Sequence, residues 1–225
     1  MPARTEFRYR SKEVSRLEAF SDVIFGFALS LIVISLEVPK TYDELMETMR
    51  GILPFSFCFF IFIGLWLQHH EFFKRYALQD RKTIWLNIGL LFVILFYVYP
   101  MKFMFVLMAR QLTGDHVALT DPQARTLFTI YGIGFTAVSW ILAAMYRHAG
   151  SLADALRLND VERIDTRERV WDNFWTGAFG ILSIALAYIY VPLAGPIYFA
   201  LFLPKTIVPM VMGAKRRRLE EALAP

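Results

Sequence analysis

Two adjacent histidines, His69 and His70, followed by Glu71, are the first place in this 225-residue chain where side chains could bind a metal ion. Neighbouring residues on a helix project about 100° apart, so the two imidazoles do not converge on one ion from a single chain. The HExxH arrangement of zinc hydrolases is absent from the sequence. We therefore interpret the histidines as members of a polar network, not as a metal centre.

Asp22 and Lys205 are charged residues inside long apolar runs. An ionisable residue in a membrane span is costly, so Asp22 is a functional candidate by default. The alternative is a carboxylate near a helix N-terminus, stabilised by the helix dipole. For Lys205 the alternatives are snorkelling toward the membrane surface and an internal ion pair with Asp172 or Asp22.

The apolar run around Asp22 has two faces when it is drawn as a helix at about 100° per residue. Asp22 points roughly 140° away from Phe27 at that pitch. If the Phe27 face borders a pore, Asp22 must lie behind it, in contact with neighbouring helices. The alternative is that the Phe27 face packs against another helix or against lipid. The residues that share this face are Phe20, Val23, Phe27, Ser30, Leu31 and Ile34.

The elements that carry these residues are apolar runs long enough to cross a membrane. The chain is 56% hydrophobic, its mean hydropathy is +0.43, and a span needs about 20 mostly apolar residues. The sequence predicts an all-α membrane protein, a single domain over residues 1–225 with six transmembrane helices. Their ranges are about 19–36, 51–67, 84–106, 127–146, 174–191 and 193–213.

Lysine and arginine alternate between loops in a way that predicts orientation. They are frequent before the first run, in the second and fourth loops and in the tail, and sparse in the other loops. By the positive-inside rule, both termini should be cytoplasmic. The net charge of +4 is spread between apolar runs and forms no single patch, which argues against nucleic acid as a partner.

The fourth loop has the pattern of a short amphipathic helix. Ala155, Leu158, Val161 and Ile164 align roughly on one side. The pattern predicts a separate helix at the inner membrane surface or against a neighbouring subunit.

The run RLEAFSD, followed by VIFGFALSLIVISLEVP, resembles the start of the transmembrane protein 175 family of lysosomal and bacterial potassium channels. The family's hallmark is an Arg, three residues, then Phe-Ser-Asp, which Arg16, Phe20, Ser21 and Asp22 match. The segments LWLQHHEFF and LNIGLLFVILFYVYP resemble the family's second and third helices over roughly the first hundred residues. Their matching residues are Trp66, His69, His70, Asn87, Leu90, Leu91 and Pro100.

The resemblance implies a pore lined by the first helix, with no TVGYG filter. It implies that a single-repeat chain is a prokaryotic member, a homotetramer in the cell membrane with potassium and lipid as partners. Phe27 stands where members commonly have Ile at an apolar constriction, and Ser30 where they commonly have Thr. The expected pore and gate residues are therefore Phe27, Ser30, Leu31 and Ile34.

We expect a potassium-selective, leak-type channel. The alternative is a secondary transporter or another carrier of small ions or protons. A transporter usually has inverted repeats and broken helices, whereas this sequence has no visible repeat and Gly26 is the only break candidate in the first run. We expect no enzymatic activity, no cofactor and no metal other than permeating potassium.

Overall fold

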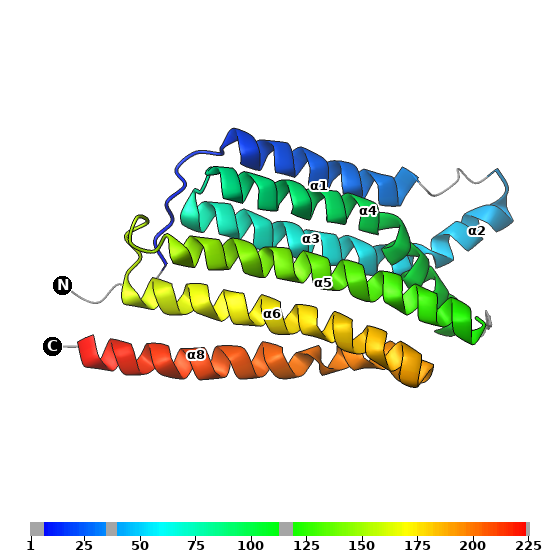
Figure 1. Cartoon of the computed structure of the whole chain (residues 1–225). Coiled ribbons are helices and arrows are strands. Elements are labelled where there is room, and N and C mark those ends of the chain that lie inside the picture. The colour runs from blue at the N-terminus through cyan, green and yellow to red at the C-terminus, as the bar shows by residue number, and fades with distance from the viewer. Residues whose placement is uncertain (1–6, 35–39, 113–118, 224–225) are drawn as a thin grey trace.

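The computed structural model describes residues 7–34, 40–112 and 119–223, and these ranges contain helices and no strand. Long helices dominate (Figure 1). They are α1 (Arg16–Ile34), α3 (Ile52–Tyr76), α4 (Arg81–Leu112), α5 (Asp121–Ser151), α6 (Asp160–Ile189) and α8 (Phe202–Leu223). Three shorter elements connect them: α2 (Tyr42–Arg50), α7 (Val191–Ala194) and the 3-10 helix η1 (Pro196–Leu201).

The long helices pack side by side as an elongated bundle with α1 at one edge and α8 at the other (Figure 1). Helix α1 packs against α3 and α4, α5 packs between α4 and α6, and α8 packs against α6. The start of α1 and the end of α8 lie at the same end of the bundle. An even number of long antiparallel helices produces this arrangement.

Helices α5 and α6 approach each other closely because glycines face one another across their contact. A Cβ atom on Gly180 would lie 2.6 Å from the carbonyl oxygen of Gly132 and 2.3 Å from the Thr136 hydroxyl. That hydroxyl donates a hydrogen bond of 3.0 Å to the Gly177 carbonyl. Small residues that let two backbones approach closely are typical of helix contacts in membranes.

The fourth loop differs from its prediction, and the separate amphipathic helix is wrong. Residues 152–157 form turns, and α6 begins at Asp160 and runs without a break into the fifth apolar run. Asn159 caps α6, since its side chain accepts a 2.8 Å hydrogen bond from the Glu162 backbone. Val161 and Ile164, assigned to the separate helix, therefore belong to the first turns of α6.

The sixth apolar run, predicted over 193–213, is divided between α7, η1 and α8. Pro192 lies in the first turn of α7 and Pro196 in the first turn of η1. Proline has no backbone N–H, so it starts a helix more readily than it continues one. Pro209, by contrast, lies inside α8.

Among the residues that the structure describes, three helical stretches are long and apolar enough, by length and composition, to cross a membrane. They are Arg81–Met104, Asp121–Ser151 and Val191–Arg217. Helices α1 and α6 carry charged residues in their first turns, Glu18 in α1 and both Asp160 and Glu162 in α6. Both helices continue from these turns into the apolar runs that the sequence shows.

Candidate pore-lining helix and its polar support

Helix α1 has one packed face and one open face in the single chain. Ser21 and Ala28 are fully buried and Phe25 is 2% exposed, on the side toward α3 and α4. Phe20 and Phe27, on the opposite side, are 55% and 54% exposed. Phe20 and Phe27 thus lie on one face of α1, as the helical phase predicted, and the buried residues lie on the other face.

Four other residues were expected on the open face, and the first of them, Val23, is 69% exposed. Ser30 is exposed, and its hydroxyl donates a 2.9 Å hydrogen bond to the Gly26 carbonyl of the same helix. Leu31 is half-buried against the core, so it lies at the border of the open face. The side chain of Ile34 lies outside the described part of the chain.

Behind α1, a buried chain of hydrogen bonds joins Ser21, Asn87 and His69. The Asn87 amide donates to the Ser21 hydroxyl at 2.8 Å, and Asn87 Oδ1 lies 2.8 Å from His69 Nε2. Because Asn87 Oδ1 can only accept, His69 Nε2 carries the hydrogen in this arrangement. Ser21 in turn donates to the Leu17 carbonyl at 2.8 Å. Polar groups at this depth need such partners, since lipid offers none.

A second contact group joins α1 to α3 through Asp22. The Trp66 indole N–H donates to Asp22 Oδ1 at 2.8 Å. The Trp66 ring stacks on His70 with 5.5 Å between centroids, and His70 Nδ1 lies 3.4 Å from Glu18 Oε1. The two histidines therefore belong to different groups, as their divergent projection from one helix requires.

Glu18 is a site residue that sequence reasoning missed. Only 4% of it is exposed, although it is charged. It precedes Asp22 by one helical turn and thus shares its side of α1. That spacing, within the RLEAFSD run, was the available signal. Arg16, the first residue of α1, is exposed.

Lys205 pairs with Asp172, the first of its two predicted partners. Its Nζ lies 2.7 Å from Asp172 Oδ2 and joins α8 to α6. Lys205 is thus far from the α1 network, because α1 and α8 occupy opposite edges of the bundle.

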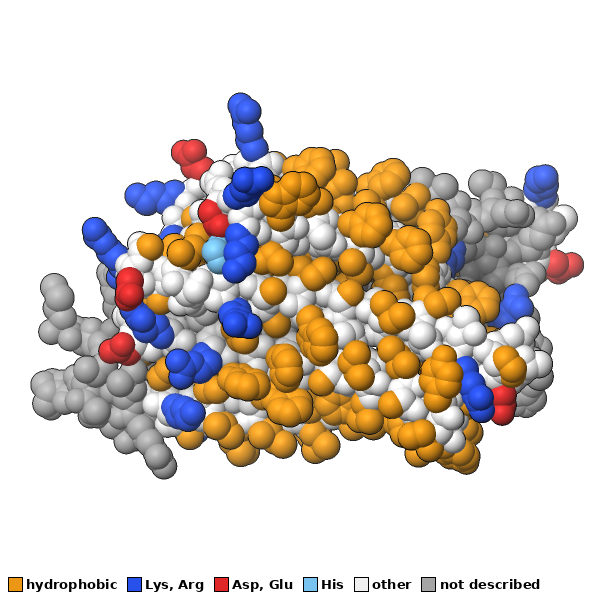
Figure 2. Space-filling view, in the orientation of Figure 1, with side chains coloured by type: hydrophobic (Ala, Val, Ile, Leu, Met, Phe, Trp, Pro, Cys, Tyr) orange, Lys and Arg blue, Asp and Glu red, His pale blue; other side chains and the backbone are white. Residues whose placement is uncertain are grey.

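The arrangement holds the back of α1 with directional bonds and leaves its front apolar apart from one hydroxyl. Figure 2 shows apolar side chains across the middle of one face of the molecule and basic side chains gathered near one end. Within residues 7–34, 40–112 and 119–223, no group of three or more His, Cys, Asp or Glu side chains could hold a metal ion.

The all-helical fold and apolar surface define a helical membrane protein. A family model described as "Endosomal/lysosomal potassium channel TMEM175" matches residues 16–97, which include α1, α3 and the polar network. A protein of Marivirga tractuosa named "Potassium channel" is 34% identical over 95% of this chain and 93% of its own length. The chain belongs to the TMEM175 family.

Two further comparisons extend over nearly the whole chain. A crystal structure of a variant of the potassium channel MtTMEM175, bound to a nanobody–MBP fusion, superposes with a TM-score of 0.82 at 30% identity. The match covers 97% of this chain and 100% of that one. The crystal structure of a TMEM175 homologue from Chamaesiphon minutus shares the fold, with a TM-score of 0.57 at 22% identity over 92% and 99% of the two chains.

Proposed function

We propose that this chain forms a potassium-selective, leak-type cation channel, with four copies arranged around a pore lined by α1. The observation that carries the proposal is the division of α1 into a back fixed by hydrogen bonds and an open front that includes Phe27. Relatives named as potassium channels support the choice of ion. One helix cannot enclose a pore, whereas symmetric copies of it can.

Phe27 is the proposed gate. A ring of phenyl groups offers no ligand to a cation, and a narrow apolar ring can close a pore by dewetting. Leu31, at the border of the face, or Ile34 would back this ring. Potassium sheds water more cheaply than sodium, so a constriction that forces partial dehydration favours potassium.

Ser30 is the proposed polar layer of the pore. Its hydroxyl hydrogen is already donated to the Gly26 carbonyl. The oxygen lone pairs of Ser30 consequently remain available to a cation or to its hydrating water. The Ser30 oxygen can therefore accept a hydrogen bond or contact a cation, and Ser30 lies on the open side of α1, one turn from Phe27.

The residues behind α1 are proposed to position it. Ser21 and Asp22 are held by Asn87 and Trp66, so both α3 and α4 restrain the rotation of α1. Because Phe27 and Ser30 lie on the same rigid helix, that restraint fixes where they point. The supporting set behind α1 is Ser21, Asp22, Trp66, His69, His70 and Asn87. Arg16 and Phe20, which belong to the same family motif, are exposed.

We further propose a multi-pass chain in a prokaryotic cell membrane, with both termini in the cytoplasm. Basic side chains gather near the end of the bundle where α1 begins and α8 ends (Figures 1 and 2). Lysine and arginine are retained on the cytoplasmic side of membrane proteins.

The proposal is tested by cation flux from liposomes containing the purified protein, with potassium and sodium gradients compared, and by native mass spectrometry in detergent. We expect faster potassium flux and a homotetramer. Equal flux of both ions would remove the selectivity. A stable monomer or dimer as the sole species would remove the four-fold pore.

A further inference from the structure

A groove at the basic end of the bundle, between the last turns of α5 and the first turns of α6, is not used by the proposed pore. Its volume is about 280 Å³. We call it the α5–α6 groove. It combines three arginines with apolar side chains, and the main lining residues are Arg147, Arg163, Arg167, Tyr146, Leu158 and Val170.

Small residues keep the groove open. Gly150 of α5 lines it, and a Cβ atom there would meet only Thr166 Cγ2, at 3.6 Å. Ala153, in the turn that follows α5, is a second small lining residue. Tyr146 is 1% exposed, and its hydroxyl has no hydrogen-bond partner among the described residues. The wall near Tyr146 is therefore apolar, and the buried Tyr146 hydroxyl lacks a hydrogen-bond partner among the described residues.

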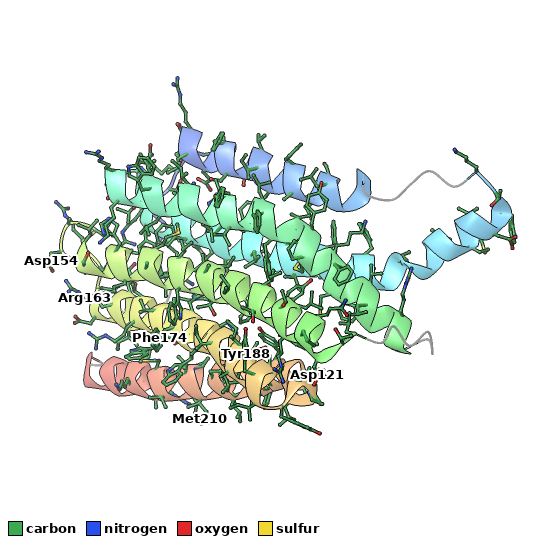
Figure 3. All side chains as sticks on the ribbon, turned by 45° about the vertical axis from the view of Figure 1, so that its right-hand side comes forward. Asp121, Asp154, Arg163, Phe174, Tyr188 and Met210 are labelled. Atoms are coloured by element: carbon green, nitrogen blue, oxygen red, sulfur yellow. The ribbon has the colours of Figure 1, made fainter. Side chains whose placement is uncertain are left out.

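The charge of the groove is unbalanced. Arg163 pairs with Asp154 and donates to the Leu158 carbonyl at 3.2 Å (Figure 3). The guanidinium groups of Arg147 and Arg167, both exposed residues, make no hydrogen bond or ion pair to any residue that the structure describes. Two unpaired guanidiniums beside a paired one form a site for an anion, and guanidinium matches phosphate geometry especially well.

The position of the groove points to the membrane surface. Val170, at one end of the groove, is followed by Trp171, Phe174 and Trp175, which are 41% to 46% exposed. Exposed tryptophans on a membrane protein mark the interface between acyl chains and headgroups. The three arginines lie on the side of these aromatic residues away from the apolar run of α6, which in the membrane placement proposed above is the level of lipid phosphates.

We propose that the α5–α6 groove binds the phosphate of an anionic phospholipid headgroup, with the start of the acyl chains over Val170, on the side of the arginines toward the apolar run of α6. This inference rests on the membrane placement proposed above. A soluble phosphate offers the same chemistry to the arginines but leaves the apolar wall uncovered, so the groove's mixed lining favours the lipid.

The test uses the full chain, purified in detergent and titrated with dioleoyl phosphatidylglycerol or dioleoyl phosphatidylcholine. Native mass spectrometry counts retained lipid, and thermal unfolding reports stabilisation. We expect a tightly held phosphatidylglycerol on each chain. Arg147→Gln with Arg167→Gln should weaken retention by about tenfold more than the control Arg81→Gln with Lys82→Gln. The control removes the same charge from exposed residues at the same end of the bundle.

A second variant separates shape from charge. Gly150→Leu fills the groove but keeps all three arginines, and it should also weaken retention of phosphatidylglycerol. Undiminished retention in the double arginine variant would overturn the proposal. Equal stabilisation by inorganic phosphate, with the same dependence on the arginines, would overturn the lipid occupant. Neither readout requires ion flux, so a failed lipid site and a failed channel are distinguishable.

Discussion

The position of Asp22 favours a role in positioning α1 over a role in binding the ion. Its carboxylate accepts the Trp66 indole hydrogen and is half-buried against α3. It therefore shares neither the exposure nor the direction of Phe27. In the proposed pore, a carboxylate so placed would control the orientation of α1, and through it the direction of Phe27 and Ser30.

We predict that Asp22→Ala lowers the yield of folded channel more than it changes ion preference. Removing the acceptor leaves the Trp66 N–H unpaired and costs about 1–3 kcal/mol. Asp22→Asn keeps an acceptor oxygen and should retain most of the yield. Size-exclusion chromatography gives the folded fraction, and reversal potentials give the selectivity. Well-folded Asp22→Ala channels with altered selectivity would place Asp22 in the ion path.

Glu162 is a second buried carboxylate, outside the proposed spans. It accepts hydrogen bonds from Arg8 and Arg10 at 3.0 and 2.9 Å, which tie the segment before α1 to α6. Burial raises the pKa of Glu162, but the hydrogen bonds from the arginines outweigh it and lower the pKa from 4.5 to about 2. The ionised form is thus favoured by folding.

A lowered pKa contributes stability that is present above the ordinary pKa and lost as pH falls toward the folded one. The thermal unfolding temperature of the wild type should therefore decrease as the pH is lowered from about 4.5 to about 2. Glu162→Gln should be less stable at neutral pH and lose less over that range. Glu13→Gln, at an exposed position, is the matched control. An identical pH dependence in Glu162→Gln and wild type would show that the contacts of Glu162 with Arg8 and Arg10 do not stabilise the fold.

At the scale of elements, the contact of α5 with α6 depends on glycine. Gly180→Ala would place a methyl group 2.6 Å from a backbone oxygen that cannot rotate away. Overpacking of this kind costs about 1–3 kcal/mol. Gly64→Ala, with nothing within 4 Å of the added atom, is the control. We expect a lower unfolding temperature for Gly180→Ala than for Gly64→Ala. Equal unfolding temperatures for the two variants would contradict a tight contact of α5 with α6 at Gly180.

The sequence indicated the bundle and much of the α1 network, because hydrophobic runs and helical phase are local properties. It did not indicate where the sixth run is divided. Proline is found both at the start of a helix, as at Pro196, and inside one, as at Pro209, so its presence in the sequence does not locate a break. It also misassigned the fourth loop, where the Asn159 cap fixes the start of α6. The pairs of Glu162 with Arg8 and Arg10 are distant in sequence and carry no local signal.

For the whole molecule, the open front of α1 lies at one edge of the bundle. Assembly around that edge would bring four copies of Phe27 together on one axis. The same assembly would leave the α5–α6 groove at the membrane surface, away from α1. Conduction and lipid binding would then involve different parts of the chain.

The most direct test of α1 as the pore is the current and reversal potential of Phe27→Ala in planar bilayers, at matched protein content. Phe92→Ala is the control, because Phe92 is 69% exposed on α4, outside the proposed pore. The proposed gate predicts that Phe27→Ala raises potassium current and weakens discrimination against sodium, while Phe92→Ala changes neither. A folded Phe27→Ala channel with wild-type current and reversal potential would contradict it.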